Sequence, residues 1–275
     1  MAEYKGIHGT KVQDYTTDPD NPLTGQVWYN ETANTLKYFY NNPGAWATGG
    51  VLNTARRLLA GAGTQTAALA FGGYTGSPSA LTESYNGTSW TEVNDLNTAR
   101  RQLAGAGTNT AALGFGGYNP TLPVSPIANT ESWNGTNWTE VNDLNTARSR
   151  LAGAGIQTAA LAFGGDPSTA VTETWNGTNW TEVNDLNTAR RELAGAGTNT
   201  AALAFGASPS LALTESWNGT NWTEVNDLNT GRGALGGVGV DNTSALAFGG
   251  EGPAVTGATE SWNGTNWTEV ADLGT

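Results

Sequence analysis

The 275-residue sequence contains no cysteine and a single histidine, and each scarcity removes a class of site. Without thiols, neither a disulfide framework nor a thiolate metal site can form. A histidine-dependent catalytic triad could use only His8. No run approaches the roughly 18 apolar residues of a membrane helix, and no apolar stretch follows Met1 as a secretory signal would require. We therefore expect no metal, no cofactor and no membrane insertion.

Charge is also scarce and mostly negative. Charged residues make up 13% of the chain, about half of the usual share of roughly 25%. Twelve basic against twenty-four acidic residues give a net charge of −12, which disfavours binding to nucleic-acid phosphates. Low charge alone suggests disorder, but 37% hydrophobic residues and 11 tryptophans predict a folded core outside the termini.

Glycine is abundant, with 38 residues, and many glycines belong to a repeated pattern. Leu-Asn-Thr begins five units, and a degenerate Leu-Gly-Thr closes the sequence. The units begin at Leu52, Leu96, Leu144, Leu186 and Leu228. One segment in each unit varies in length while the rest is nearly constant, which predicts that these segments share one face of a repeat architecture. The variable segments are 74–81, 118–129, 166–171, 208–213 and 251–258.

Every unit shows β-strand patterns and no sustained helical period. Thr66–Phe71 is a short apolar run ended by glycines, typical of a buried strand, and Leu59–Gly63 has only small residues after its leucine. Two more strands flank Asn134–Asn137, whose Asn-Gly pair is a strong hairpin signal. Four short strands in each unit of 42–48 residues predict a propeller blade. We expect an all-β, five-bladed β-propeller with the Ala/Gly strand innermost and aromatic residues between the blades.

The unit also resembles the kelch repeat. The second unit shows the resemblance in Phe115-Gly116-Gly117, in Trp133 and Trp138, and in Thr98-Ala99-Arg100. The turn between the two tryptophans is shorter than in most kelch repeats, and the fourth unit has Gly206-Ala207 in place of two glycines. The resemblance implies a kelch-like propeller over residues 51–275, in which the repeated aromatics pack between blades.

A second resemblance covers almost the whole chain and concerns virion-associated proteins of tailed phages that infect marine bacteria. It rests on Asp20–Asn30, Leu36–Tyr38 and Gly44–Trp46, followed by the repeats. The resemblance implies a tail-fibre-like or other particle-surface protein, made in the host cytoplasm. The implied partners are other virion proteins, bound through the N-terminal residues, and a host-surface glycan or other receptor. Whether the protein forms a homo-oligomer is left open.

Residues 1–50 differ from the repeats and contain all three lysines. Residues 1–22 are polar and read as an extended arm, whereas Gln26–Tyr29 and Thr35–Tyr40 read as strands. Trp46–Gly50 stands where the fourth strand of a blade would, just before the first Leu-Asn-Thr. Two interpretations remain, a separate attachment module or strands that close the propeller ring, and we favour the module.

The repeated tryptophans have two interpretations. An indole ring suits the C–H face of a sugar and adds an N–H donor, so these residues are candidate sugar platforms. Packing between blades is the favoured alternative. The tryptophans at the start of the fourth strand are Trp90, Trp138, Trp180, Trp222 and Trp267. Their partners at the end of the third strand are Tyr85, Trp133, Trp175, Trp217 and Trp262.

An arginine recurs near the start of the first strand in every unit. Five such residues could ring a channel mouth and attract anionic glycans, but an ion pair with a neighbouring carboxylate is the favoured alternative. The arginines are Arg56, Arg100, Arg148, Arg190 and Arg232. The carboxylates considered for these pairs are Asp95, Asp143, Asp185 and Asp227.

The positions after these arginines vary, and propeller topology places them beside the variable segments. We expect ligand contacts on this face, with neutral variation in solvated loops as the alternative. The expected contact residues are Tyr74, Tyr118, Asn119, Asp166, Arg57, Arg101, Arg150 and Arg191.

Paired carboxylates such as Glu131 and Glu140 recur in every unit and raise the alternative of a glycosidase. An active site normally needs one asymmetric constellation, so five copies indicate a scaffold or multivalent binding, and we expect no enzyme. The leading hypothesis is host-surface recognition by a phage particle, with glycans as ligands. The alternatives are structural decoration of the particle without a ligand and, third, a carbohydrate-active enzyme.

Overall fold

The computed structural model describes residues 13–17, 27–38 and 45–274. The chain divides into two compact units, residues 1–44 and 45–275, so residues 45–50 fall in the second unit. The first unit contains one sheet of three strands in the order β1 (Gln13–Tyr15), β2 (Val27–Asn30) and β3 (Thr35–Tyr38). The parallel strand β1 was not predicted. Most of the predicted arm over residues 1–22, including His8, lies outside the described residues.

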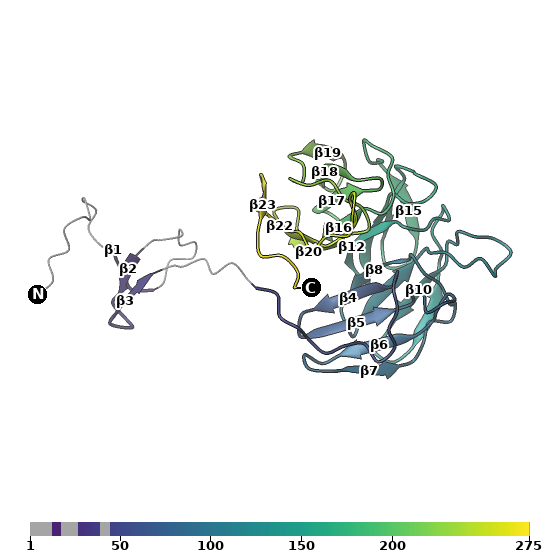
Figure 1. Cartoon of the computed structure of the whole chain (residues 1–275), viewed down its shortest axis with the longest axis horizontal. Helices are drawn as coiled ribbons and strands as arrows, with labels where there is room; N and C mark the ends of the chain where they lie inside the picture. Colours follow the sequence, from purple (N-terminus) through teal and green to yellow (C-terminus); the bar gives the residue numbers. More distant parts are fainter. Residues whose placement is uncertain (1–12, 18–26, 39–44, 275) are drawn as a thin grey trace, which may run out of the picture. The chain divides into compact units, whose positions relative to one another are not determined.

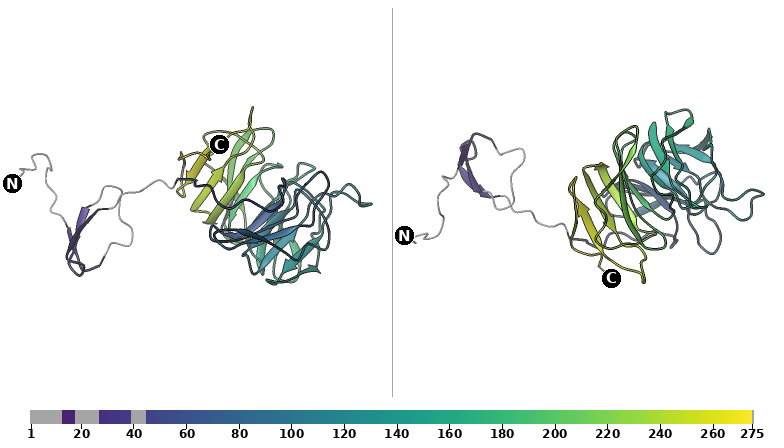
Figure 2. Two further views of the ribbon diagram at one scale, coloured as in Figure 1. Left: turned by 60° about the horizontal axis from the view of Figure 1, so that its bottom comes forward. Right: turned by 90° about the horizontal axis from the view of Figure 1, so that it is seen from above.

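The second unit is a five-bladed β-propeller, which confirms the predicted fold class (Figures 1 and 2). Blade 1 contains β4 (Ala60–Thr64), β5 (Ala67–Phe71), β6 (Thr82–Tyr85) and β7 (Trp90–Val93). Blade 2 contains β8 (Ala104–Gly107), β9 (Ala112–Phe115), β10 (Thr130–Trp133) and β11 (Trp138–Val141). Blade 3 contains β12 (Ala152–Ile156), β13 (Ala159–Phe163), β14 (Thr172–Trp175) and β15 (Trp180–Val183).

Blade 4 contains β16 (Ala194–Gly197), β17 (Ala202–Ala207), β18 (Leu211–Trp217) and β19 (Trp222–Val225). Blade 5 contains β20 (Gly236–Asp241), β21 (Ser244–Phe248), β22 (Thr259–Trp262) and β23 (Trp267–Glu269). Each blade is antiparallel, and its strands neighbour one another in chain order; we call them strands a to d from the axis outward. In the part of the chain that the structure describes, no helix has the length and apolar character needed to cross a membrane.

The turn between strands c and d shows how the repeated Asn-Gly sequence forms a blade. The Oδ1 atom of Asn134 accepts hydrogen bonds from the backbone N–H groups of Thr136 and Asn137, at 2.9 and 2.8 Å. Gly135 has a φ of 91°, a left-handed conformation that favours glycine. This turn sets the register in which Trp133 pairs with Trp138 across the two strands.

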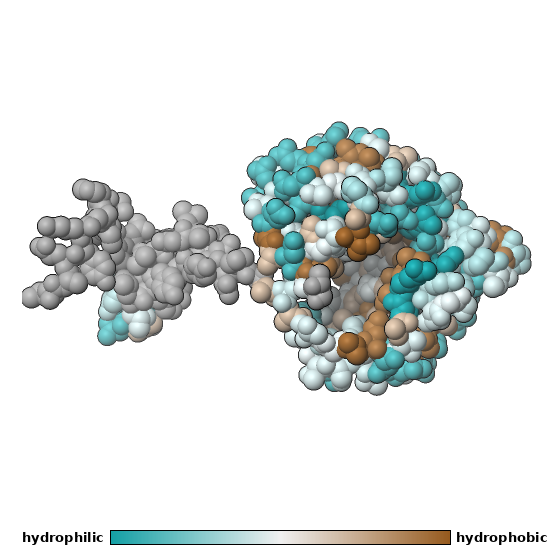
Figure 3. Space-filling model, in the orientation of Figure 1, coloured by the Kyte–Doolittle hydropathy of each residue, from teal (hydrophilic) through white to brown (hydrophobic). Residues whose placement is uncertain are grey.

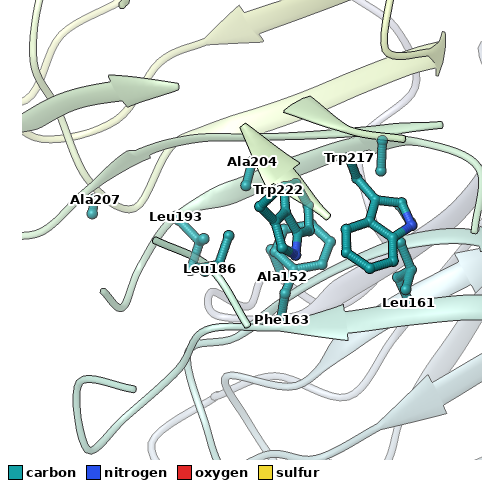
Figure 4. Close-up of a cluster of buried hydrophobic side chains, with 11 residues drawn as sticks. Ala152, Leu161, Phe163, Leu186, Leu193, Ala204, Ala207, Trp217 and Trp222 are labelled. Atoms are coloured by element: carbon teal, nitrogen blue, oxygen red, sulfur yellow. The ribbon is translucent and has the colours of Figure 1, made fainter. Parts of the chain in front are cut away.

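The blades pack face to face through a repeated aromatic contact. At the interface of blades 3 and 4, the ring centroids of Phe163 and Trp222 lie 4.9 Å apart (Figure 4). The indole N–H of Trp222 donates to the Thr172 hydroxyl of blade 3 at 3.1 Å. Equivalent contacts join blades 1 to 2, 2 to 3 and 4 to 5. A cluster of buried apolar side chains fills each of these four interfaces.

Strand a needs small residues because neighbouring blades approach each other most closely near the axis. A Cβ atom built on Gly153 would lie 3.0 Å from the carbonyl oxygen of Gly105 in the preceding blade, and one on Gly195 would lie 2.7 Å from that of Gly153. The predicted Ala/Gly-lined axis is therefore present, and it encloses a cavity of about 470 Å³.

Residues 45–50, which we call the strip, contact the blades at both ends, through Trp46 and Gly50. The ring centroid of Trp46 lies 5.1 Å from that of Phe248, and its indole N–H donates to the Thr259 hydroxyl of blade 5 at 3.2 Å. At the other end of the strip, the Gly50 carbonyl accepts a hydrogen bond from the indole of Trp90 in blade 1. Residues 45–50 thus bridge blades 5 and 1 at the rim of the propeller.

Candidate functional site

The five repeated arginines are structural ion-pair residues and not a charged ring open to ligands. Arg148 is fully buried, and its guanidinium lies 2.9 Å from the carboxylate of Glu173 on strand c of the same blade. The other repeated arginines make the same pair with the strand c glutamate of their own blades. These pairs are Arg56–Glu83, Arg100–Glu131, Arg190–Glu215 and Arg232–Glu260.

The ion-pair alternative for these arginines was therefore correct, but the aspartates suggested as partners have another role. Asp185 accepts a hydrogen bond from the backbone N–H of Thr172 at 3.0 Å and so fixes the start of strand c. The same bond recurs in the other blades. The sequence did not separate the two acidic positions, because both recur in every unit. Only the register across strands brings the glutamate under the arginine.

Burial and pairing shift the pKa values of these groups in opposite directions. It lowers the pKa of Arg148 because desolvation penalises the charged guanidinium, while the nearby Glu173 carboxylate opposes this effect. In blade 1, burial raises the pKa of Glu83, but hydrogen bonds from Arg56 and from the backbone of Asn53 and Thr54 outweigh it. The pKa of Glu83 consequently lies below its ordinary value of 4.5.

The face that carries the variable segments, which we call the loop face, is assembled by short backbone bridges. The residue after each repeated arginine pairs with the first residue of the variable segment in the same blade. In blade 2, the N–H of Tyr118 donates to the carbonyl of Arg101 at 2.8 Å, and the reverse bond measures 3.1 Å. Equivalent bridges occur in blades 1, 3 and 5, and in blade 4 the N–H of Ser208 donates to the carbonyl of Arg191 at 3.0 Å. These bonds place all five segments around one mouth of the axis.

Four of the expected contact residues form one cluster over blades 1 and 2. The guanidinium of Arg101 lies 4.5 Å from the ring centroid of Tyr74 and 5.3 Å from that of Tyr118. Arg57 lies 5.5 Å from the Tyr74 centroid. Within the described residues, neither Arg57 nor Arg101 has a carboxylate within ion-pair distance. This aromatic–cationic cluster therefore carries two positive charges that form no ion pair with a described acidic side chain.

The expected residues over blades 3 and 4, by contrast, all take part in ion pairs. Arg191 lies 2.6 Å from the carboxylate of Asp166, and Arg150 lies 2.9 Å from Glu192. All four side chains are partly exposed, with exposed fractions between 26% and 39%, whereas the repeated core arginines are buried. The loop face is thus divided into a cationic sector over blades 1 and 2 and a charge-balanced sector over blades 3 and 4.

An inner ring of residues surrounds the axis at the loop face. It consists of Leu58, Gln102, Arg150, Glu192 and Ala234. All five have φ values between 51° and 57°, which is uncommon for residues other than glycine. The backbone N–H of each residue from Gln102 onward donates to the carbonyl of the preceding ring member, at 2.8–2.9 Å. These bonds orient the ring side chains around a depression of about 270 Å³. Figure 3 shows that the surface of the propeller is hollowed in this view.

Asn119 is the expected contact residue that the structure places in the interior. Its exposed fraction is 6%, its side-chain N–H donates to the Ala99 carbonyl at 2.8 Å, and its Oδ1 atom accepts bonds from Thr121. Ile127 is also buried, with an exposed fraction of 5%. The accessible part of the segment 118–129 is consequently Tyr118 and the tip 120–124.

The repeated tryptophans lie between blades. Trp138, Trp180, Trp222 and Trp267 each have an exposed fraction of 5%, and their indole N–H groups are bonded to the neighbouring blade. Their ring faces are therefore unavailable for stacking on a sugar. Trp90 is only half-buried, and its ring lies 5.0 Å from that of Tyr85.

The repeated carboxylate pairs do not share an open pocket. Glu131 and Glu140 are directly opposite across strands c and d, but Glu131 is buried in its ion pair while Glu140 is exposed and accepts a bond from Asn129. Within residues 13–17, 27–38 and 45–274, no group of three or more histidine or acidic side chains is placed to hold a metal ion.

Comparison with known families gives no further guide to the ligand. No family model matches the sequence, and a search of curated proteins finds no match.

Proposed function

We propose that the protein is a phage virion-surface or tail-fibre-like protein that recognises acidic glycans on the host through its loop face. The observation that carries the proposal is the cluster of Arg57, Tyr74, Arg101 and Tyr118. It holds two guanidinium groups that pair with no carboxylate of the described residues, in a protein whose net charge is −12. The phage context rests on the sequence resemblance described above.

The chemistry of the cluster suits a sugar that carries a carboxylate or sulfate. A guanidinium forms paired hydrogen bonds with planar anionic groups, and its contact with a tyrosine ring holds it in place before the ligand arrives. Tyrosine adds a flat apolar surface for the C–H face of a sugar ring and a hydroxyl that donates and accepts. Several weak sites on one particle gain avidity when the host glycans are dense. Residues 1–50 are then the part that attaches to other virion proteins.

The test compares two variants of equal net charge. Arg101→Met removes the guanidinium but keeps an apolar stem of similar length, whereas Thr181→Glu adds one negative charge on the exposed strand d of blade 3. Binding of acidic host polysaccharide is measured on an immobilised-protein sensor, with the carboxyl-reduced polysaccharide as a ligand control.

We expect Arg101→Met to weaken binding about tenfold or more, because a hydrogen bond to a charged group contributes roughly 1.5–3 kcal/mol. Thr181→Glu should bind like the wild type. Unchanged binding by Arg101→Met, or an equal loss in both variants, would contradict recognition through this cluster.

A further inference from the structure

The five blades do not close into a continuous ring by direct packing. Blades 1 to 5 share four interfaces, each with its own buried apolar cluster. The space between blade 5 and blade 1, which we call the seam, has no such cluster among the described residues. The inner ring shows the same break. Four hydrogen bonds link its five members from Leu58 to Ala234, and none joins Ala234 back to Leu58.

The faces that border the seam are the same surfaces that form the four interfaces elsewhere. On blade 5, Phe248 and Leu246 are only half-buried, although the equivalent phenylalanines and leucines of the other blades are 0–1% exposed. Val238, on strand a beside them, is 50% exposed. On blade 1, Trp90 and Ala68 are half-buried, whereas their blade 2 counterparts lie in the interior. The apolar surfaces that contact a neighbouring blade elsewhere are thus accessible on blade 5 and on blade 1 at the seam.

Glycine contacts near the axis give independent evidence. In blades 2 to 5, a Cβ atom built on the strand a glycine would lie 2.7–3.0 Å from the carbonyl oxygen of the preceding blade's glycine. Gly61 of blade 1 has no such neighbour, because a Cβ atom there would meet only the Leu69 carbonyl of its own blade, at 3.4 Å. No described residue of another blade therefore lies against Gly61 at the seam.

The strip 45–50 supplies one strand of the missing element. Trp46 contacts Phe248 and Thr259 of blade 5 as the strand d tryptophans of blades 2 to 5 contact the blades that precede them. Trp46 also precedes Leu52 by the same number of residues as Trp90 precedes Leu96. The strip therefore occupies the position of strand d in a further blade. Its residues are exposed and pair with none of the described strands, so its backbone edge can add one.

We propose that the seam is a docking site for strands a, b and c of a sixth repeat of the same type, carried by a partner polypeptide. The strip 45–50 would serve as strand d of the composite blade. We expect the partner to make at the seam the same contacts that recur at the four existing interfaces. Towards blade 5 it places a strand a glycine against the Gly237 carbonyl, and towards blade 1 it places a strand b phenylalanine on Trp90. A cavity lined by Ala68, Trp90 and Phe248 already extends from the axis into this space.

A peptide copy of one repeat tests the proposal on the full-length protein. The probe is a synthetic peptide of residues 144–175, which contains strands a to c of blade 3 and lacks strand d. The matched control peptide carries Phe163→Ala, which removes the aromatic side chain expected to pack on Trp90. Binding is followed by titration calorimetry, and burial of Trp90 and Trp46 by a blue shift of tryptophan emission.

Two protein variants separate docking from folding. A methyl group at Gly61 meets only the Leu69 carbonyl in the free protein, so Gly61→Ala should keep the unfolding midpoint of the wild type. It should weaken peptide binding about tenfold or more, because the docked strand would lie against it. Val238→Arg places a charge on the seam face of blade 5 and should also prevent docking.

The expected result is one peptide bound per protein, with weaker binding of the Phe163→Ala peptide and of both protein variants. Absence of binding would overturn the proposal, whatever else fills the seam. Equal binding to the wild type and to a folded Gly61→Ala protein would overturn it as well, since the peptide would then be bound elsewhere.

Discussion

At the scale of single residues, the buried arginine–glutamate pair is the most consequential contact in each blade. In blade 3, Glu173 neutralises the buried guanidinium of Arg148 and accepts backbone hydrogen bonds from Asn145 and Thr146. Removing one member leaves the other charge buried without a partner. The pair therefore holds strand c against the start of strand a, and it does so five times around the axis.

The corresponding prediction uses two glutamates that face each other across strands c and d. Glu173→Gln should destabilise the protein by roughly 3–5 kcal/mol, because it breaks a buried ion pair from one side. Glu182→Gln, directly opposite but exposed, should leave the free energy of unfolding nearly unchanged or slightly raised, because it removes a like charge. Denaturant titrations of both variants measure this difference. A similar loss of stability in the two variants would contradict a stabilising role of the buried Arg148–Glu173 pair.

The lowered pKa of Glu83 predicts an acid limb in stability. Because the folded pKa lies below 4.5, the unfolded chain binds more protons than the folded chain between these two values. The contribution of Glu83 is complete above 4.5 and is lost as the pH falls through the folded pKa. Denaturant midpoints measured between about pH 5 and pH 3 should therefore decline less steeply for Glu83→Gln than for the wild type. Parallel slopes would contradict the assignment.

At the scale of the element, the unit of construction is the tryptophan of strand d seated on the preceding blade. Trp138 packs on Phe71 at a centroid distance of 4.8 Å, and its indole N–H donates to the Thr82 hydroxyl. The exposed fraction of Trp138 is 5%. Trp90 has the same place in its own blade but borders the seam. Equivalent sequence positions therefore have different environments in this propeller.

This difference gives a prediction in which one residue controls for the other. Trp138→Ala should cost roughly 3–5 kcal/mol of stability, as expected for a large buried aromatic side chain. Trp90→Ala should cost clearly less, because Trp90 is half-buried and contacts no phenylalanine of a preceding blade. Unfolding by guanidinium measures both. Equal costs would mean that the seam is closed around Trp90 in solution.

The strands, turns and blade number could be predicted from the sequence because five copies make the strand pattern visible. Asn134-Gly135 fixes a hairpin locally, and the variable segments mark the loop face. The role of Trp46 required the tertiary structure, although its spacing to Leu52 carries the signal. The burial of Asn119 could not be predicted, because it depends on the Ala99 carbonyl that the fold brings beside it. The repeated arginines were expected to pair with aspartates, and the glutamate partners could not be predicted for the same reason.

The accessible tip of the longest segment yields a further prediction. Replacing the whole segment 118–129 would remove Ile127 from the interior, so residues 122–124 of the tip are the better target. A two-residue Gly-Ser linker in place of 122–124 should change the unfolding midpoint little, because these residues are exposed and Thr121, which donates to the buried Asn119, is kept. A large loss of stability would show that the tip packs on the blade. If the tip contributes to recognition, host-cell binding should fall in this folded variant.

At the scale of the whole molecule, the protein combines a constant scaffold with one variable face. The opposite face consists of repeated turns between strands a and b and between strands c and d, which have nearly the same sequence in every blade. The loop face instead differs between blades in charge, in aromatic content and in length. An uneven distribution of this kind suits recognition of one ligand orientation by a rigid body, with the cationic sector over blades 1 and 2 as its centre.

Hydrogen–deuterium exchange with and without acidic host polysaccharide tests recognition through the loop face most directly. We expect slower exchange in the peptides that contain Arg57, Tyr74, Arg101 and the tip 120–124, with unchanged exchange in the turns such as Asn134–Asn137. Protection confined to the turns of the opposite face, or to residues 1–50, would contradict it.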